Sequence, residues 1–284
     1  MCLTGCDLVF GLRGRADPDA AIVDVTIDQP IDAAETGCMQ DPSRTDDEDG
    51  DEFPNSCDNC PHVAQADQLD SDNDGVGNAC DPRPFAVDTI DYFDGFDSLP
   101  LGLDLLPANR WKIENGRLVA FGVPYGTDAL ARLRHSVGDA QIITRLTLLV
   151  SDGDPESAGV WARLGSLAGT PEQYPPGVLF EVLRNTAGAV RRCQITETWQ
   201  YARVAIECAQ NAALFQTGRA YTMSLDCVEG QEPECRGVIA YDTSEGHTEI
   251  PIDWPEATRA MGPVGLRVYA VDAAFDYMVV ISHE

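Results

Sequence analysis

The chain has 284 residues, of which 44% are hydrophobic, so it is long enough to bury one substantial core and a smaller module. Its 47 acidic residues outnumber the 19 basic ones and give a formal net charge of −28. A charge of that size repels phosphate backbones and anionic lipid surfaces, which excludes nucleic acid as a partner. The ten cysteines cluster in pairs, a pattern typical of proteins that fold in an oxidising compartment, so we expect an exported protein.

Residues 1–36 are expected to form an N-terminal anchor and an acidic tether. The segment Leu3-Thr4-Gly5-Cys6 resembles a bacterial lipobox, which implies that the Cys6 thiol receives diacylglycerol after cleavage behind Gly5. An apolar stretch before it is missing, so either the chain begins upstream or the match is accidental. No run of apolar residues approaches the length of a membrane span. The sequence therefore predicts membrane contact only through a lipid at Cys6, on a bacterial cell surface or outer membrane, or else secretion.

Two stretches place an aspartate at every second position, residues 47–51 and residues 70–74. Alternate residues of an extended turn point to one side, so three carboxylates converge and repel each other unless a hard cation such as Ca²⁺ lies between them. Both stretches fit the register of a twelve-residue calcium loop, with ligands at positions 1, 3, 5, 7, 9 and 12. The predicted ligands are Asp47, Asp49, Asp51, the Phe53 carbonyl, Asn55 and Asp58 in the first loop, and Asp70, Asp72, Asp74, the Val76 carbonyl, Asn78 and Asp81 in the second. Gly75 supplies the sharp turn at position 6, whereas Glu52 stands there in the first loop, so the second loop is the better match.

Two other interpretations of this region stay open. An acidic run can be a solvated, disordered segment. Cys57 and Cys60 could instead form a redox pair, or half of a zinc site with Cys38, Cys80 or His62. Thiolates beside so many carboxylates are electrostatically disfavoured, and the surrounding oxygens suit calcium better.

Prolines and cysteines border both loops, so the flanking helices of an EF-hand do not fit. Residues 51–81, DEFPNSCDNCPHVAQADQLDSDNDGVGNACD, resemble the thrombospondin type 3 repeat, in which a Cys-Asp-Asn-Cys-Pro step joins aspartate-rich, disulfide-closed units. The departures from that family are Glu52, Asn55, Gln65, Ala66 and Asn78. The resemblance implies a calcium-binding module over residues 37–84, closed by the disulfides Cys38–Cys57 and Cys60–Cys80. Its few apolar side chains cannot offset the chain entropy, so it needs both the metal and the disulfides.

From Phe85 onward, short β-rich runs recur at roughly ten-residue spacing between turn-forming residues, as in a β-sandwich or barrel. In one of them, Leu266, Val268 and Ala270 share a face. The clearest predicted strands are residues 117–120, 141–150, 158–164, 178–183, 190–195, 202–208, 220–227, 237–241, 265–270 and 275–281. Two disulfides are predicted among them: Cys227–Cys235 across a hairpin, and Cys193–Cys208 between neighbouring strands.

The order of these features resembles the concanavalin A-like jelly roll of the laminin G and legume-lectin type. The similarity lies in residues 93–96, 111–118, 158–163 and 262–280. The predicted fold is therefore all-β, with a jelly-roll β-sandwich over residues 85–284 that follows the small, irregular, disulfide-closed module. These motifs mark turns and core strands, so they support the fold rather than an activity.

Signals for catalysis are weak. Some members of that superfamily hydrolyse glycans with Glu-x-Asp-x-x-Glu on one strand, and that spacing is absent here. The nearest acidic cluster, residues 249–256, contains two prolines, so we expect a connecting loop. The alternative is an acid and a base around an exposed Trp254.

Trp161 and Arg163 are the candidate ligand-binding residues of the sandwich. They lie two apart on a predicted strand, so they share a face and could stack on and hydrogen-bond to a sugar. The alternative is a core tryptophan with an arginine that reaches to the rim. Tyr174, Trp199 and Tyr201 carry the same ambiguity.

These patterns together predict an exported, calcium-binding surface protein, with Ca²⁺ as its cofactor. A rigid acidic stalk would present the jelly-roll domain for binding or adhesion to a glycan or an extracellular protein. The alternatives are a glycan-active hydrolase of the concanavalin-like class and a structural surface spacer. A pair of carboxylates roughly 5 to 9.5 Å apart in a groove would favour the hydrolase.

Overall fold

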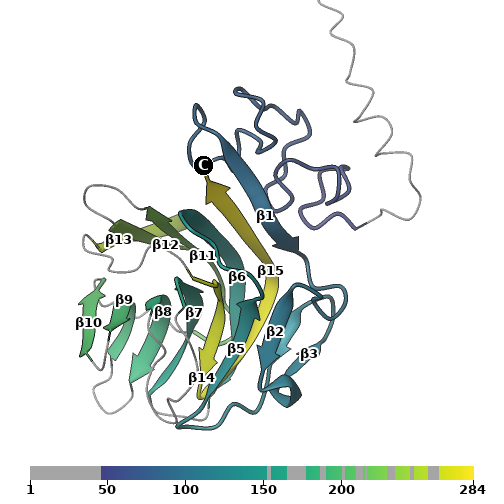
Figure 1. Cartoon of the computed structure of the whole chain (residues 1–284). Coiled ribbons are helices and arrows are strands. Elements are labelled where there is room, and N and C mark those ends of the chain that lie inside the picture. Colours follow the sequence, from purple (N-terminus) through teal and green to yellow (C-terminus); the bar gives the residue numbers. More distant parts are fainter. Residues whose placement is uncertain are drawn as a thin grey trace, which may run out of the picture.

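The computed structural model describes residues 46–151, 155–164, 177–185, 190–199, 202–208, 214, 216–228, 234–243, 246–254 and 262–284. In this part of the chain, strands pair into two antiparallel sheets, one with eight strands and one with seven (Figure 1). The two sheets pack face to face, so the fold is the predicted jelly-roll β-sandwich. Within the same residues, no helix has the length and apolar character needed to span a membrane.

The eight-stranded sheet has the order β13-β12-β11-β6-β15-β4-β3, and β1 also pairs with β15. Its strands are β1 (Asp88–Asp94), β3 (Trp111–Ile113), β4 (Leu118–Ala120), β6 (Ala140–Ser151), β11 (Ala220–Val228), β12 (Glu234–Thr243), β13 (Gly246–Trp254) and β15 (Val271–His283). The seven-stranded sheet has the order β10-β9-β8-β7-β14-β5-β2. Its strands are β2 (Leu103–Leu106), β5 (Asp128–Leu133), β7 (Glu156–Ala162), β8 (Gly177–Asn185), β9 (Val190–Trp199), β10 (Ala202–Glu207) and β14 (Gly265–Tyr269). A 3-10 helix, η1 (Ala108–Arg110), precedes β3.

Strict alternation of side chains builds the core between the sheets. On β11, Tyr221, Met223 and Leu225 are buried, while the residues between them are only partly covered. These side chains meet Phe180 from β8 and Leu266 from β14 in one hydrophobic cluster. Burial at about 25 cal/mol per Å² of apolar surface makes this cluster the main source of stability for the sandwich.

Each of the ten predicted runs overlaps a strand of the structure. The prediction of a loop over residues 249–256 was wrong, because residues 246–254 form β13. β13 is the edge strand of its sheet, and Pro251 lies opposite Val238 of β12. An edge strand has one backbone side without a neighbour, so a proline is tolerated there and the argument from prolines did not apply.

The described disulfides follow the prediction. The bonds Cys60–Cys80, Cys193–Cys208 and Cys227–Cys235 are formed, and Cys227 lies directly opposite Cys235 in the β11–β12 hairpin. Cys57 is disulfide-bonded, and its predicted partner Cys38 lies outside the described residues, as does Cys6. Because Cys57 and Cys60 are both engaged in disulfides, neither the redox pair nor the zinc thiolate site is present.

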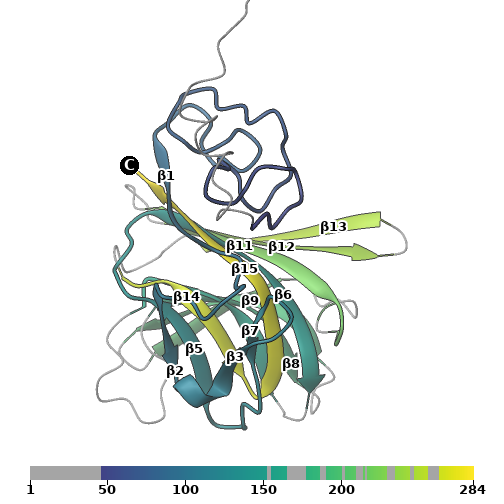
Figure 2. The ribbon, with the colours of Figure 1, turned by 90° about the vertical axis from the view of Figure 1, so that its right-hand side faces the viewer.

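Residues 46–87, which we call the aspartate module, contain no helix or strand and lie on the outer face of the eight-stranded sheet (Figure 2). Val76 has no exposed surface and packs against Ile143 of β6 and against Val279 and Ile281 of β15. The His62 ring lies 5.5 Å from the ring of Tyr277. The module therefore does not project as a stalk, and the sheet supplies the apolar contacts that the module's own sequence lacks.

A β-bulge in β15 shapes the outer face of the eight-stranded sheet where the module packs. The register of β15 against β6 shifts between Phe275 and Met278, and both of these side chains belong to the core. The two residues between them, Asp276 and Tyr277, are displaced from regular alternation, and Tyr277 joins the cluster under the module. A bulge re-aims side chains in this way without ending the strand.

We predict that Val76→Ala lowers the free energy of unfolding by about 1–2 kcal/mol, because it leaves a cavity between the module and the sheet. Val87→Ala is the matched control: Val87 is 53% exposed, and we expect a change within about 0.5 kcal/mol. Urea denaturation in saturating calcium measures both. Equal effects of the two substitutions would show that the contact contributes nothing.

Candidate calcium and ligand sites

The two aspartate loops, residues 47–58 and 70–81, fold through the same internal hydrogen bonds. The aspartate at position 1 accepts the backbone amides of positions 4 and 6, at 2.8 and 3.1 Å in the first loop and at 2.7 and 2.9 Å in the second. The aspartate at position 5 accepts the amide of position 7, at 2.9 and 2.8 Å. The asparagine at position 9 accepts the amide of position 2, at 2.8 and 2.9 Å. The loops therefore share the register predicted from the sequence.

Position 6 explains why glycine is expected in such loops. Gly75 has a φ of 96°, in the left-handed region that glycine adopts without penalty. Glu52 occupies the equivalent place with a φ of 82°. A side chain in that conformation costs on the order of 1 kcal/mol, so the first loop holds more backbone strain than the second.

The carboxylates at positions 1, 3 and 5 converge in both loops. Each of these two groups offers one ligand atom per residue, all within 4.8 Å of one another; the groups are Asp47, Asp49 and Asp51, and Asp70, Asp72 and Asp74. Both carboxylate oxygens of Asp72 and the Oδ2 of Asp49 are inaccessible to solvent and have no hydrogen-bond partner among the described residues. Burial and the charges of Asp58 and Asp51 raise the pKa of Asp49 to about 6. Oxygens that are buried, convergent and without donors are the donor set that a hard cation requires.

The aspartates at position 12 lie beside these groups rather than within them. Asp58 accepts the backbone amide of Cys60 and the Nε2 of Gln68, at 2.8 and 2.9 Å, and its Oδ2 is buried without a described partner. Asp81 accepts the backbone amide of Arg83 at 2.7 Å, and its Oδ2 is also buried without a described partner. The asparagines at position 9 turn their side-chain oxygens to backbone amides. In the structure, positions 1, 3 and 5 therefore form the first part of each site, and position 12 faces it from the side.

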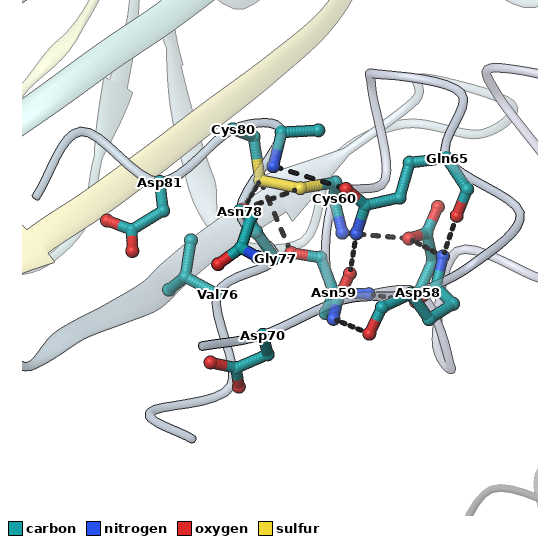
Figure 3. The surroundings of a disulfide bond; sticks show 12 residues. Asp58, Asn59, Cys60, Gln65, Asp70, Val76, Gly77, Asn78, Cys80 and Asp81 are labelled. Carbon is teal, nitrogen blue, oxygen red and sulfur yellow. Dashed lines mark hydrogen bonds between the residues drawn. A yellow bond between two sulfur atoms is a disulfide. The ribbon is translucent and has the colours of Figure 1, made fainter. Parts of the chain in front are cut away.

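Two glutamines to which the sequence assigned no role bind the loops, and Gln65 joins one loop to the other (Figure 3). The backbone amide of Gln65 donates to Asp51 at 2.9 Å, and its side chain bonds Asn59 at 2.9 Å and the amide of Ala79 at 3.1 Å. Gln68 Nε2 donates to Asp58, beside the Cys60–Cys80 disulfide. Their role could have been predicted from their place in the sequence, between two loops of equal register. Such loops need neutral hydrogen-bond donors for the carboxylate oxygens that face away from the metal site.

A second candidate site is a polar pocket of about 510 Å³ on the sandwich. Thr222 lies beside buried neighbours on β11, so the pocket opens on the outer face of the eight-stranded sheet, the face that also carries the module. Its walls include Arg145, Gln216, Arg219, Thr222, Tyr241, Asp242 and His247. The guanidinium of Arg219 lies 5.4 Å from the centre of the Tyr241 ring, and His247 Nδ1 lies 2.9 Å from Asp242 Oδ1. Hydrogen bonds to Asp242 and Glu249 raise the pKa of His247.

The predicted ligand pair Trp161 and Arg163 does not form an exposed platform. Trp161 has no exposed surface and packs with Leu130, Leu164 and Leu179. Arg163 follows the end of β7, is 1% exposed, and has a φ of 55°, which ends the alternation on which the shared face depended. Its Nη2 lies 3.3 Å from Asp139 Oδ1. Trp161 is therefore buried, but in a cluster separate from the core between the sheets and on the same face of β7 as Gly159, and Arg163 is buried rather than at the rim.

A row of buried polar residues crosses the face of the seven-stranded sheet that points away from the core. Across the neighbouring strands β14, β7, β8 and β9, the residues paired in register are Arg267, Gly159, Glu181 and Gln194. Gly159 has no side chain, so Arg267 reaches across it to Glu181 at 2.7 Å, and Gln194 also donates to Glu181 at 2.5 Å. Arg267 Nε bonds Asp128 at 2.8 Å as well. These carboxylates are bound by neutralising partners, so they do not resemble the free acid and base of a hydrolase.

The other aromatic candidates are accounted for as follows. Trp254 is 5% exposed, and its Nε1 donates to Glu197 Oε2 at 3.0 Å, so it is not the exposed tryptophan of that alternative; Glu256 lies outside the described residues. Trp199 is the last residue of β9, and Tyr174 and Tyr201 lie outside the described residues.

Comparisons with known proteins add the following. No protein-family model matches the chain, and no curated protein matches it. Among solved structures, the chain is similar to a carbohydrate-binding module from Bacillus subtilis, with a TM-score of 0.42 and 17% identity over 61% of this chain and 91% of that one. It is also similar to a legume lectin-like domain from Entamoeba histolytica (TM-score 0.45, 10% identity, 60% and 85% coverage) and to a protein of unknown function with a galectin-like fold from Bacillus subtilis (0.46, 12%, 69% and 98%). Similarities of this strength carry no conclusion about function.

The buried ring of His62 gives a pH prediction. Burial lowers the pKa of His62 to about 4, below the 6.5 of the unfolded chain, so the folded protein binds fewer protons. The stabilisation from neutral His62 is complete above pH 6.5 and is lost as the pH falls towards 4, by on the order of 2–3 kcal/mol. We expect the difference in unfolding free energy between the wild type and His62→Gln to shrink by that amount over this range, measured by urea denaturation. A difference that does not change with pH would contradict the burial of a neutral ring.

Proposed function

We propose that the chain is an exported protein that binds calcium through its two aspartate loops and a saccharide through its jelly-roll domain. The observation that carries the calcium proposal is the set of buried, convergent carboxylate oxygens without described donors in both loops. Residues 46–87 contain twelve acidic residues and one arginine, so the module's own side chains cannot neutralise them. Cations from solution are the remaining source of positive charge.

Calcium fits these loops better than other metals. The side chains that converge are carboxylates, and the backbone carbonyls of Phe53 and Val76 stand at position 7 as further oxygen donors. Calcium takes six to eight oxygen ligands in flexible geometry, whereas zinc prefers the sulfur and nitrogen ligands that are engaged elsewhere here. The equal register of the loops and the Cys60–Cys80 bond also match the thrombospondin type 3 repeat that the sequence resembles.

Export is supported by the disulfides, because such bonds persist in oxidising compartments. The proposed lipid attachment at Cys6 would hold the protein on a cell surface.

The saccharide proposal rests on the polar pocket beside the module. A sugar presents hydroxyl groups that need both donors and acceptors, and the pocket provides Arg219, Gln216 and Thr222 together with Asp242. Tyr241, which is 4% exposed, lies in the pocket wall under the guanidinium of Arg219. Pockets of 300–1,000 Å³ with a few convergent polar groups are typical of small-ligand sites.

The calcium proposal is tested by isothermal titration of the full chain. We expect at least two calcium ions per chain, with dissociation constants of roughly 10⁻⁴ to 10⁻³ M. Asp72→Asn should empty the second loop and leave the first, because Asp72 offers a ligand atom to the cluster and both of its oxygens are buried without a described partner. Asp67→Asn removes the same charge from an exposed place outside both loops and should bind like the wild type. No binding at millimolar calcium would refute the proposal.

The saccharide proposal is tested on a glycan array in saturating calcium. For any glycan retained by the wild type, Asp242→Ala should weaken binding at least tenfold, since the pocket loses an acceptor for sugar hydroxyls. Asp253→Ala, on the neighbouring edge strand and 72% exposed, should not. Retention of the glycan by Asp242→Ala would place the binding site elsewhere.

A further inference from the structure

Asp88, the first residue of β1, is a buried carboxylate at the junction of the module and the sandwich. It has no exposed surface. Its Oδ1 accepts hydrogen bonds from Arg83 Nε and from His283 Nδ1, each at 2.9 Å. Its Oδ2 is inaccessible to solvent and has no hydrogen-bond partner in the described chain. One half of this carboxylate is thus fixed by two cationic donors, while the other half is left without any.

The unpartnered oxygen of Asp88 has a counterpart in the second aspartate loop. The carboxyl groups of Asp81 and Asp88 are within hydrogen-bonding reach of each other, although neither can donate when ionised. Asp81 is 9% exposed, and its Oδ2 likewise has no partner among the residues described. Asp74 joins them, since its Oδ2 accepts the backbone amide of Asp88. Carboxylates of the second loop and of the first strand of the sandwich therefore lie next to one another.

The charges around this point do not balance without further cations. His283 faces Asp88 with Nδ1 and Asp226 with Nε2, both at 2.9 Å, so both ring nitrogens must donate and the ring is positively charged. Arg83 is the other positive group. The carboxylates are Asp70, Asp72, Asp74, Asp81, Asp88 and Asp226. Six negative charges against two positive ones leave four, which is the charge of two divalent ions. The cluster of Asp70, Asp72 and Asp74 accounts for one of them.

We propose that Asp81 and Asp88 together hold a second divalent cation, calcium under the conditions of the exported protein, at the seam between the module and the first strand of the sandwich. This inference rests on the proposed calcium function of the loops and adds a ligand that lies outside the twelve-residue motif. Arg83 and His283 orient Asp88 through its Oδ1 and leave its Oδ2 for the metal. Without this ion, the packing of Val76 against the sheet would bring the negative charges of Asp81 and Asp88 together. The ion removes their repulsion and so stabilises the contact between the module and the sheet.

Calcium stoichiometry of the full chain, measured by equilibrium dialysis, tests this proposal. Asp88→Asn should bind one calcium fewer than the wild type, with the far-ultraviolet circular dichroism of the wild type as the check that it folds. Asp91→Asn removes a carboxylate from the exposed side of the same strand and should bind as many ions as the wild type. An Asp88→Asn protein that binds the full number of ions would overturn the proposal and would indicate a proton shared between Asp81 and Asp88.

A second measurement keeps the proposal testable if Asp88→Asn does not fold. Anomalous diffraction from wild-type crystals grown with terbium should show one peak at the Asp70, Asp72 and Asp74 cluster and another between Asp81 and Asp88. A peak at the cluster alone overturns this inference and leaves the calcium function of the loops intact. The absence of peaks at both loops overturns the two proposals together.

Discussion

The constraint on which the rest of this structure depends is the repulsion among the carboxylates of the aspartate module. Each loop folds by turning aspartate oxygens to backbone amides, so these side chains supply the acceptors that helix or sheet carbonyls supply elsewhere. The same turns bring the carboxylates at positions 1, 3 and 5 together. When carboxylates accept the hydrogen bonds of the backbone amides, negative charge accumulates in the loops. Within residues 46–87, one arginine is the only basic residue other than His62.

The sandwich is shaped to receive such a module. Its outer face is apolar where Ile143, Val279 and Ile281 lie, and the bulge in β15 brings Tyr277 to that face as well. Without the module, these side chains would form an exposed hydrophobic patch on the sheet. The module in turn has too few apolar residues to fold around a core of its own. The module therefore covers the apolar face of the sheet, and the sheet gives the module the apolar contacts that it lacks. The contact between them is a packed interface rather than a flexible joint.

Much of this could be predicted from the sequence, and the failures have physical causes. The strands and the described disulfides were predictable because alternation and cysteine spacing are local signals. The edge position of β13 was not, since proline is tolerated or excluded according to neighbours that local sequence does not reveal. The docking of the module could not be predicted from the strand that it covers. The run from Met278 to Ile281 is apolar on both faces, which predicts that both faces are buried but does not identify the segment that buries them. The register of the loops could be predicted from the sequence. The surroundings of Asp81 could not, because its neighbour Asp88 belongs to a different part of the fold.

Buried charge is managed in opposite ways in the two parts of the chain. On the seven-stranded sheet, Arg267 neutralises Asp128 of β5 and reaches over Gly159 to neutralise Glu181 of β8. Such pairs need no ligand, and breaking one would strand a buried charge at a cost of about 3–5 kcal/mol. Residues 46–87 contain a single arginine, and under the proposed calcium function the stability of the module depends on cations from the surrounding solution. Asp88 lies where the two strategies meet: one oxygen is paired with basic side chains as in the sandwich, and the other faces an aspartate loop. Under the proposed calcium function, Asp88 links the sandwich to the ionic state of the module, in addition to the apolar contacts made by Val76.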